Sequence, residues 1–385
     1  MNRARVAFVT LAMLAFATHV HAEAQWKAHG ILDLGLVSSI EGRELNRLTI
    51  GDSNFDPYRV RLFLDARVAP GLELHVQSIL HEGAWGLRAD GAYAMWTPWE
   101  GRDLSLEAGK IPWLIGTYAP RAYSDRNWLV GTPLLYQYRT ALPWAELLTN
   151  TDDLVANAGI AQRDQEATFL PVVDERWWDT GAACLASFAP WEFAAGIIQG
   201  SPSWPTPGTD NTPGSSVLGR IGVVPVAGVR AGVSAADGTW MPEFVSYGLP
   251  TGRDVRDYHE STLMADLELA RGLFEARGEY AFRRWQTAYT GDLRVRAGYA
   301  EARWTHSSGA WLALRGEAMR FSDVATTTAA SRPWDDPVDR WEGVVGYRVT
   351  HEVRAKAGVQ RTVRQPFGAG RERTDLLFAG LGIQF

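Results

Sequence analysis

Cysteine and lysine are scarce in this chain of 385 residues: Cys184 is the one cysteine, and lysine occurs only at Lys27, Lys110 and Lys356. A single cysteine excludes an intrachain disulfide, and we expect Cys184 to pack as a small apolar side chain. The scattered histidines show no metal-ligand spacing, and no glycine-rich phosphate loop is present, so no metal or other cofactor is expected. The net charge of −6 argues against nucleic acid as a partner.

Long apolar runs are also missing after the N-terminus. Arg3 and Arg5 precede an apolar stretch at 6–17, and Val20-His21-Ala22 forms a small-x-small cleavage sequence. This pattern predicts a secretory signal peptide at 1–22, removed from a mature chain of 23–385. No later stretch reaches 18 apolar residues, which excludes a conventional membrane-spanning helix in the mature chain.

Strict alternation of apolar and polar residues takes the place of those runs. In the last eleven residues, one face of an extended strand carries apolar side chains that end on Phe385. A tilted strand of about 9–11 residues is long enough to cross a membrane. The same alternation is typical of an ordinary half-buried strand, and the export signal favours the membrane interpretation.

The alternation recurs along the whole mature chain. The strands are connected by short turns and by longer polar loops, in alternation. The expected strands are residues 27–37, 57–68, 72–80, 87–97, 103–111, 175–188, 191–200, 216–225, 227–236, 259–270, 272–285, 293–304, 310–321, 340–350, 352–363 and 375–385. The fold class is therefore all-β: a transmembrane antiparallel barrel of about sixteen strands, with fourteen or eighteen as alternatives. The short turns would be periplasmic, and both termini would lie on that side.

Tryptophan is abundant, with 17 residues, and is expected in two aromatic girdles at the membrane boundaries. The girdle candidates beside short turns are Trp96, Trp99, Trp191, Trp304 and Trp311, and those beside long loops are Trp240, Trp285, Trp334 and Trp341.

Two stretches resemble known outer-membrane proteins. The terminal strand, through Gly380, Leu381, Ile383 and Phe385, resembles the assembly signal of bacterial outer-membrane barrels. That resemblance implies recognition by the barrel assembly machinery, a location in the cell outer membrane, and contact with its lipid and lipopolysaccharide.

The stretch Gly109-Lys110-Ile111-Pro112, followed by Gly116 and Pro120, is similar to a Gly-Lys-x-x-Pro stretch of the porin O/P family, with proline one residue earlier. The resemblance to sixteen-stranded porins implies a channel, leaves a homotrimer open, and implies that the loop after the fifth strand folds inward. Phosphate selectivity is not implied, because lysine is so scarce here.

The segment 112–174 follows the fifth expected strand and carries the first candidates for a pore constriction: Arg121, Arg126, Tyr136, Tyr138 and Arg139. Guanidinium groups interleaved with aromatic rings can contact anionic or aromatic solutes. An external loop over the mouth, or a contact with a neighbouring subunit, are the alternatives.

Charged residues on the water-facing side of the strands are the second group of candidates. Both signs occur in similar number, so most of them are expected to form ion pairs across neighbouring strands. Arg59, Arg61 and Arg67 are the exception, because they are expected to form an unneutralised basic strip.

The sequence as a whole predicts a porin for passive diffusion of small hydrophilic solutes or ions. The first alternative is a barrel that serves as a scaffold or sheath for a periplasmic electron-transfer or secretion partner. The second is a barrel hydrolase, suggested by His306 and Ser308, although these residues fall in an expected turn and no further catalytic motif accompanies them. We therefore expect no catalytic residues.

Overall fold

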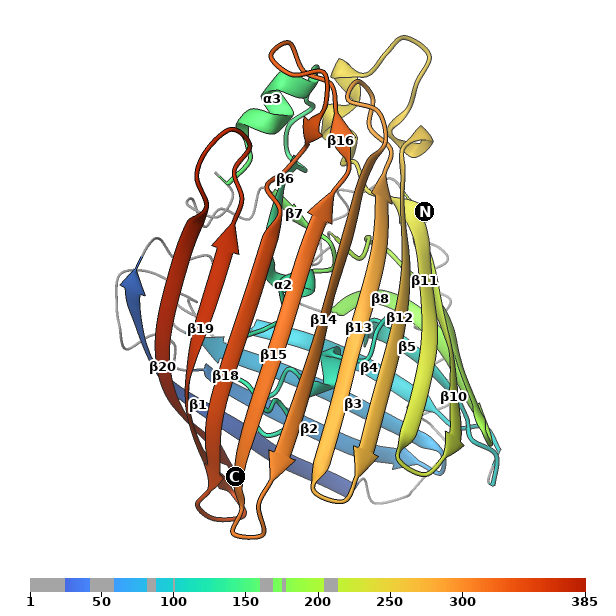
Figure 1. The fold of residues 1–385 in the computed structure, drawn as a ribbon. Coiled ribbons are helices and arrows are strands. Elements are labelled where there is room, and N and C mark those ends of the chain that lie inside the picture. The colour runs from blue at the N-terminus through green and yellow to red at the C-terminus, as the bar shows by residue number, and fades with distance from the viewer. Residues whose placement is uncertain are drawn as a thin grey trace.

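The long strands of the chain form one continuous sheet that closes on itself (Figure 1). The computed structural model describes residues 25–41, 59–81, 88–99, 101–159, 169–174, 178–203 and 214–385. The expected signal peptide, 1–22, lies outside the described residues and stays a prediction.

Sixteen antiparallel strands form the barrel, in the order β1-β2-β3-β4-β5-β8-β9-β10-β11-β12-β13-β14-β15-β18-β19-β20. They are β1 (Gln25–Glu41), β2 (Arg59–Ala69), β3 (Leu72–His81), β4 (Arg88–Trp96), β5 (Leu104–Pro112), β8 (Trp178–Phe188), β9 (Trp191–Ile198), β10 (Ser216–Val226), β11 (Val229–Thr239), β12 (His259–Arg271), β13 (Phe274–Trp285), β14 (Leu293–Thr305), β15 (Ala310–Phe321), β18 (Val338–Arg348), β19 (Val353–Arg364) and β20 (Glu372–Gln384). The expected fold class and strand number are confirmed.

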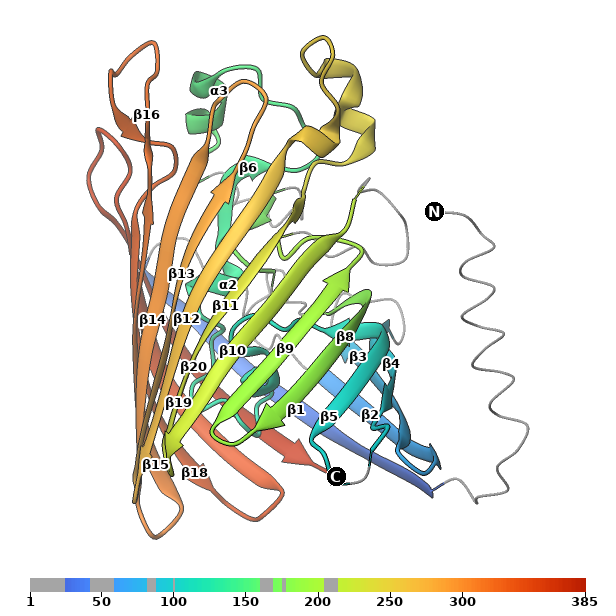
Figure 2. The same cartoon turned by 90° about the vertical axis from the view of Figure 1, so that its right-hand side faces the viewer.

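The short connections lie at one end of the barrel, which we call the turn end, and the long ones lie at the other, the loop end (Figure 1). The loop end carries the 3₁₀ helices η3 (Glu243–Gly248) and η4 (Val255–Asp257) and a small hairpin of β16 (Asp323–Val324) and β17 (Arg332–Pro333). Strands β4, β5 and β9 are short, whereas β12–β15 are long and upright (Figure 2). None of the helices in the described ranges has the length and hydropathy of a membrane-spanning helix.

The strand register turns apolar side chains outward and charged ones inward, because side chains alternate along a strand. In β2, Leu62 and Leu64 are each 39 % exposed on the outer face, whereas Arg61 points inward and is buried. In β15, Leu312 and Leu314 face out, and Arg315 is buried inside. A water-filled or protein-filled interior and an apolar exterior are typical of membrane barrels.

The barrel closes by pairing of β1 with β20 from Ile31↔Gln384 to Glu41↔Asp375. Phe385 continues the pairing: its carbonyl accepts a hydrogen bond from the Gly30 amide at 2.8 Å, and its amide donates to the Gly30 carbonyl at 3.1 Å. The Phe385 ring lies over Gly30, where a Cβ atom would come within 2.4 Å of the ring. The seam between β1 and β20 therefore includes an aromatic ring packed over a glycine that leaves space for it.

Several outward placements differ from expectation. Trp96, Trp99, Trp191, Trp304 and Trp341 are exposed, but Trp240, Trp285, Trp311 and Trp334 are buried inside the barrel, so the girdle prediction was wrong for these four. Trp285 and Trp311 have the inward parity of their strands, whereas Trp240 and Trp334 lie in loop-end connections, where their indole N–H groups donate to the carbonyls of Gln286 and Arg294. Cys184 is exposed on the outer face of β8 and not packed in a core.

Placing an arginine on either face of β2 tests the register. Leu62→Arg puts a charge in the outward band and should destabilise the barrel by about 2–4 kcal/mol if the position lies near the bilayer midplane. Phe63→Arg introduces the same charge inward, beside Asp65, and should cost less. The free energy of unfolding in lipid vesicles measures both; a larger loss for Phe63→Arg would contradict the register.

Removing Phe385, or filling the space beneath it with Gly30→Val, should lower the yield of closed barrel, because either change breaks the seam between β1 and β20. Heat-modifiable gel mobility after refolding in detergent measures the closed fraction. Gly370→Val is the matched control, since nothing lies within 4 Å of a Cβ atom at Gly370. A normal yield from both seam variants would show that closure does not need the terminal ring.

Candidate functional site: the barrel lumen

Part of the segment between β5 and β8 lies inside the barrel, where α2 is seen behind β14 and β15, whereas α3 lies at the loop end (Figure 1). It contains the 3₁₀ helix η2 (Ala119–Arg121), α2 (Leu134–Gln137), β6 (Arg139–Pro143), α3 (Thr151–Ala156) and β7 (Phe169–Pro171). Its described parts, 113–159 and 169–174, are mostly irregular, so their turns and short helices satisfy only part of the backbone within the segment. We call 113–174 the inward segment.

Carboxylates of the barrel wall accept hydrogen bonds from backbone amides of the inward segment. Glu342 accepts from Val130 at 2.8 Å and from Gly131 at 3.0 Å. Glu317 accepts from Leu134 at 2.5 Å. Glu279 accepts from the Thr117 amide. Buried backbone groups need partners, and these side chains supply them.

Basic side chains of the same wall donate to the segment's carbonyls. The Nζ of Lys356 donates to the carbonyls of Ser124, Asn127 and Leu129, at 2.9, 2.5 and 3.2 Å. Arg315 donates to the Gly131 carbonyl at 2.9 Å, and Arg340 to that of Thr132 at 2.5 Å. We call these donors and the accepting carboxylates the wall clamp; its members are Glu279, Arg315, Glu317, Arg340, Glu342 and Lys356.

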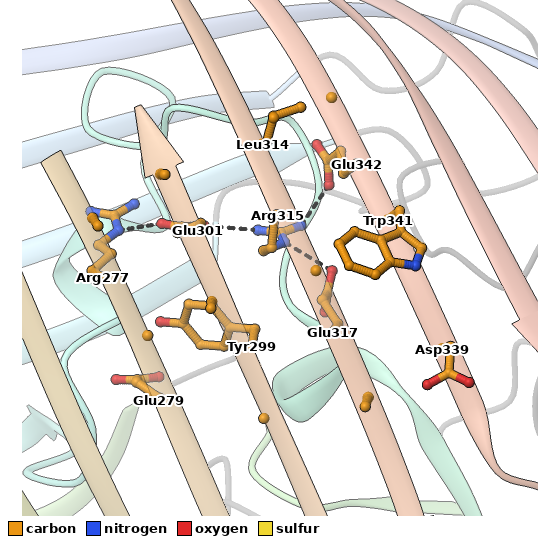
Figure 3. A pocket seen from close by; sticks show the side chains of 18 of the residues that line it. Arg277, Glu279, Tyr299, Glu301, Leu314, Arg315, Glu317, Asp339, Trp341 and Glu342 are labelled. Atoms are coloured by element: carbon orange, nitrogen blue, oxygen red, sulfur yellow. Dashed lines mark hydrogen bonds and ion pairs between the residues drawn. The ribbon is translucent and has the colours of Figure 1, made fainter. Parts of the chain in front are cut away.

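The clamp residues also bond to one another across neighbouring strands (Figure 3). Arg315 contacts Glu342 at 2.6 Å, Glu317 at 2.8 Å and Glu301 at 3.5 Å. Glu301 also pairs with Arg277, and Glu317 with Arg340. The interpretation of most lumen charges as ion pairs is confirmed, because each of these guanidinium groups meets at least one carboxylate.

Hydroxyl groups of the segment add to this attachment. The Tyr136 hydroxyl donates to Glu279 at 2.5 Å, and burial, reinforced by the negative charge of Glu279, raises the pKa of Tyr136 well above its ordinary value. Tyr138 donates to Asp335 at 3.2 Å. Asp335 lies in the connection before β18, and burial raises the pKa of its carboxyl to about 7. Both phenols therefore remain protonated donors.

A cavity of about 740 Å³ remains beside the inward segment, along the β4–β11 part of the wall. Tyr93, Tyr123 and Trp178 line one part of it, and Glu192, Arg220 and Arg230 line another. Arg102 and Asp103, which lie next to the β4–β5 turn, place one mouth of the cavity at the turn end.

The charges around this cavity are paired. Arg220 binds Asp266 at 2.6 Å, Arg230 binds Glu192 at 2.7 Å, and Arg121 pairs with Glu268. The ring of Tyr93 stacks on His75 at 5.0 Å and lies 6.1 Å from that of Trp178. The lining thus combines aromatic faces with balanced ion pairs, which can exchange hydrogen bonds with a polar solute.

The expected constriction residues separate in space. Arg121 lines the cavity, and Arg126 is exposed beside Asp125. Tyr136, Tyr138 and Arg139 are buried, and Arg139 pairs with Asp174 at 3.0 Å. These three side chains position the segment and do not face open lumen, so an influence on conduction through segment position stays a prediction.

The expected basic strip is not unneutralised. Arg61 and Arg59 lie 3.3 and 3.7 Å from Asp33, and Arg67 lies 2.9 Å from Glu73. That expectation was wrong because the acids come from neighbouring strands, whose register the sequence did not fix. A role for the three arginines as pore residues remains untested.

His306 and Ser308 do come together, with Nδ1 and Oγ 2.8 Å apart in the β14–β15 turn. The same Nδ1 accepts the Ser308 backbone amide at 3.2 Å, which is a turn-closing contact.

Sequence reasoning named the clamp residues only as lumen charges and missed that they bond to backbone. It also missed Tyr93 and Trp178 as cavity residues, whereas Tyr123 belongs to the stretch 121–128 that was expected to line a constriction. The alternation of β4, which turns Tyr93 inward, is a signal that could have identified Tyr93.

No family model matches the chain, and no curated protein matches it. Solved structures do. An anion-selective porin from Comamonas acidovorans superposes with a TM-score of 0.59 at 10 % identity, over 94 % of this chain and 100 % of that one. The outer-membrane channel DcaP of Acinetobacter baumannii gives 0.58 at 10 % identity, over 95 % and 99 %. OmpF of Salmonella typhi, in complex with daunomycin, gives 0.56 at 10 % identity, over 94 % and 97 %. The chain thus has the closed sixteen-stranded antiparallel barrel of the outer-membrane porins.

Proposed function

We propose that the chain is an outer-membrane porin through which small hydrophilic solutes diffuse down their gradient. The observation that carries the proposal is that the inward segment leaves part of the lumen open. Gly116 and Tyr123 of the segment donate to Ser234 of β11 and Gln77 of β3. The clamp holds the segment against β13–β19, and a cavity of about 740 Å³ remains on the β4–β11 side. An inward segment that leaves this space open narrows the lumen without filling it.

The lining of that cavity favours solutes with hydroxyl groups over a strong preference for one ionic sign. Paired guanidinium and carboxylate groups offer both donors and acceptors, and their charges nearly cancel. Aromatic faces at Tyr93 and Trp178 add surface on which a ring can lie.

The same proposal includes the cellular setting. The N-terminal signal would export the chain, and the barrel assembly machinery would recognise the strand that ends on Phe385. The turn end would face the periplasm, and the outer face would contact lipid and lipopolysaccharide. Three of these barrels would associate as a homotrimer; OmpT of Vibrio cholerae, a similar barrel at 10 % identity, has been solved in a trimer form.

Changing Arg121 tests whether the cavity is the conduction path. Arg121→Ala removes a guanidinium from the lining and leaves Arg230, at 3.7 Å, as the remaining cationic partner of Glu268 among the described residues, so the reversal potential in a salt gradient should move toward cation preference. Planar-bilayer recording measures it. Arg126→Ala is the matched control, because Arg126 is exposed and lies outside this lining, and its shift should be smaller. Equal behaviour of parent and Arg121→Ala would place the path elsewhere, and a barrel that conducts no ions would overturn the proposed function.

Weakening the clamp should make the channel noisier. Lys356→Met keeps the side-chain length but removes the donor to three carbonyls, and each unsatisfied buried group costs roughly 1–3 kcal/mol. The segment around 124–129 should then move, with larger open-channel fluctuations and faster proteolysis there. The exposed Lys27→Met is the matched control. Quiet single-channel currents from Lys356→Met would mean that other contacts hold the segment alone.

A further inference from the structure

A second cavity of the lumen, of about 270 Å³, lies at the turn end. The inward segment supplies Asp125 and Trp128, and the wall supplies Arg303 of β14, Arg348 of β18 and Arg354 of β19. It is separate from the 740 Å³ cavity on the β4–β11 side.

Two arginines of this cavity oppose each other directly. Arg348 and Arg354 are register partners in the β18–β19 pair, and both point inward. Like charges in directly opposed positions destabilise a sheet. Elsewhere in the lumen the comparable guanidinium groups, those of Arg277, Arg315 and Arg340, meet carboxylates.

Among the described residues neither arginine has a carboxylate at ion-pair distance, although the charge of Asp125 acts on Arg354. Arg354 donates to the neutral amide oxygen of Gln384 at 3.1 Å. The third arginine, Arg303, is bound by Glu275. Asp125 is the one carboxylate among the residues that line this cavity.

One side of the cavity is formed by a guanidinium group packed on an aromatic ring. The Arg303 guanidinium stacks over the Trp128 ring at 4.8 Å, which fixes both groups against the wall. A guanidinium presents a planar fork of donors that matches the oxygens of a carboxylate or a phosphate. A volume of about 270 Å³ accommodates a compact anion, not a polymer.

We propose that Arg348 and Arg354 form a binding site for a compact oxyanion, a phosphate or carboxylate group, at the turn-end mouth of the lumen. The anion neutralises the opposed guanidinium groups and accepts hydrogen bonds from both strands. Binding of this kind does not require that the barrel conduct, so the site stands apart from the proposed function.

Isothermal titration of the folded barrel in detergent, at constant ionic strength, tests the site with inorganic phosphate and with succinate. The parent should bind at least one of the two, and the double variant Arg348→Gln/Arg354→Gln should bind roughly tenfold more weakly or worse, because charge-assisted hydrogen bonds are lost. Binding of phosphate alone would assign the site to phosphate groups, and binding of both would assign it to oxyanions in general.

The matched control is Arg294→Gln/Arg296→Gln, which removes the same charge from outward positions near the loop end. It should bind like the parent. Heat-modifiable mobility checks that each variant is folded, and Arg348→Lys, which keeps the charge but loses the fork, provides a milder second variant with an intermediate loss. Absence of binding by the parent, or equal affinity in the parent and both site variants, would overturn the proposal. Loss of conduction with binding retained would count only against the proposed function.

Discussion

The rest of the lumen depends on satisfying the backbone of one irregular segment inside a closed barrel. Strand backbones bond to their neighbours all the way round, but the irregular parts of the inward segment have no neighbouring strand to pair with throughout. Charged side chains of β13–β19 take that role, with carboxylates on its amides and Lys356 on three of its carbonyls. A buried amide or carbonyl without a hydrogen-bond partner would lower the stability of the folded barrel. The charged side chains therefore hold the segment in place, and the segment in turn holds those side chains in place.

The charged side chains have different partners on the two sides of the barrel wall. On the β13–β19 side, the arginine and glutamate side chains pair with one another and bond to the backbone of the inward segment. Figure 3 shows the ion pairs around Arg315. On the β4–β11 side, ion pairs such as Arg220–Asp266 border open space together with aromatic rings. Near-balance of charge in both regions explains why counting lumen arginines says little about ion preference. The opposed pair Arg348 and Arg354 departs from that balance, which makes it chemically distinct.

The outer face follows simpler physics. Exposed leucines such as Leu62 and Leu314 form an apolar exterior, and closure is completed where Phe385 covers Gly30. A barrel leaves no free sheet edge, so its two terminal strands must match in register, and the final residue takes part in that match. The low sequence identity to barrels of the same architecture is consistent with this, because alternation and closure constrain residue class far more than residue identity.

The sequence by itself determined the strands, their number and the face of most side chains, because apolar and polar residues alternate with a period of two along each strand. The inward position of Arg61 and the outward position of Leu62 follow from that alternation alone. Only the tertiary structure decided which charges meet. Asp33 neutralises Arg61 from a strand 28 positions earlier, and Glu342 reaches the amide of Val130, more than 200 positions away. It also decided that Trp285 and Trp334 pack inside, and that Tyr136 and Arg139 are buried. The physical reason is that alternation is local, whereas pairing depends on the relative register of strands and on the path of an irregular segment, which no periodicity encodes.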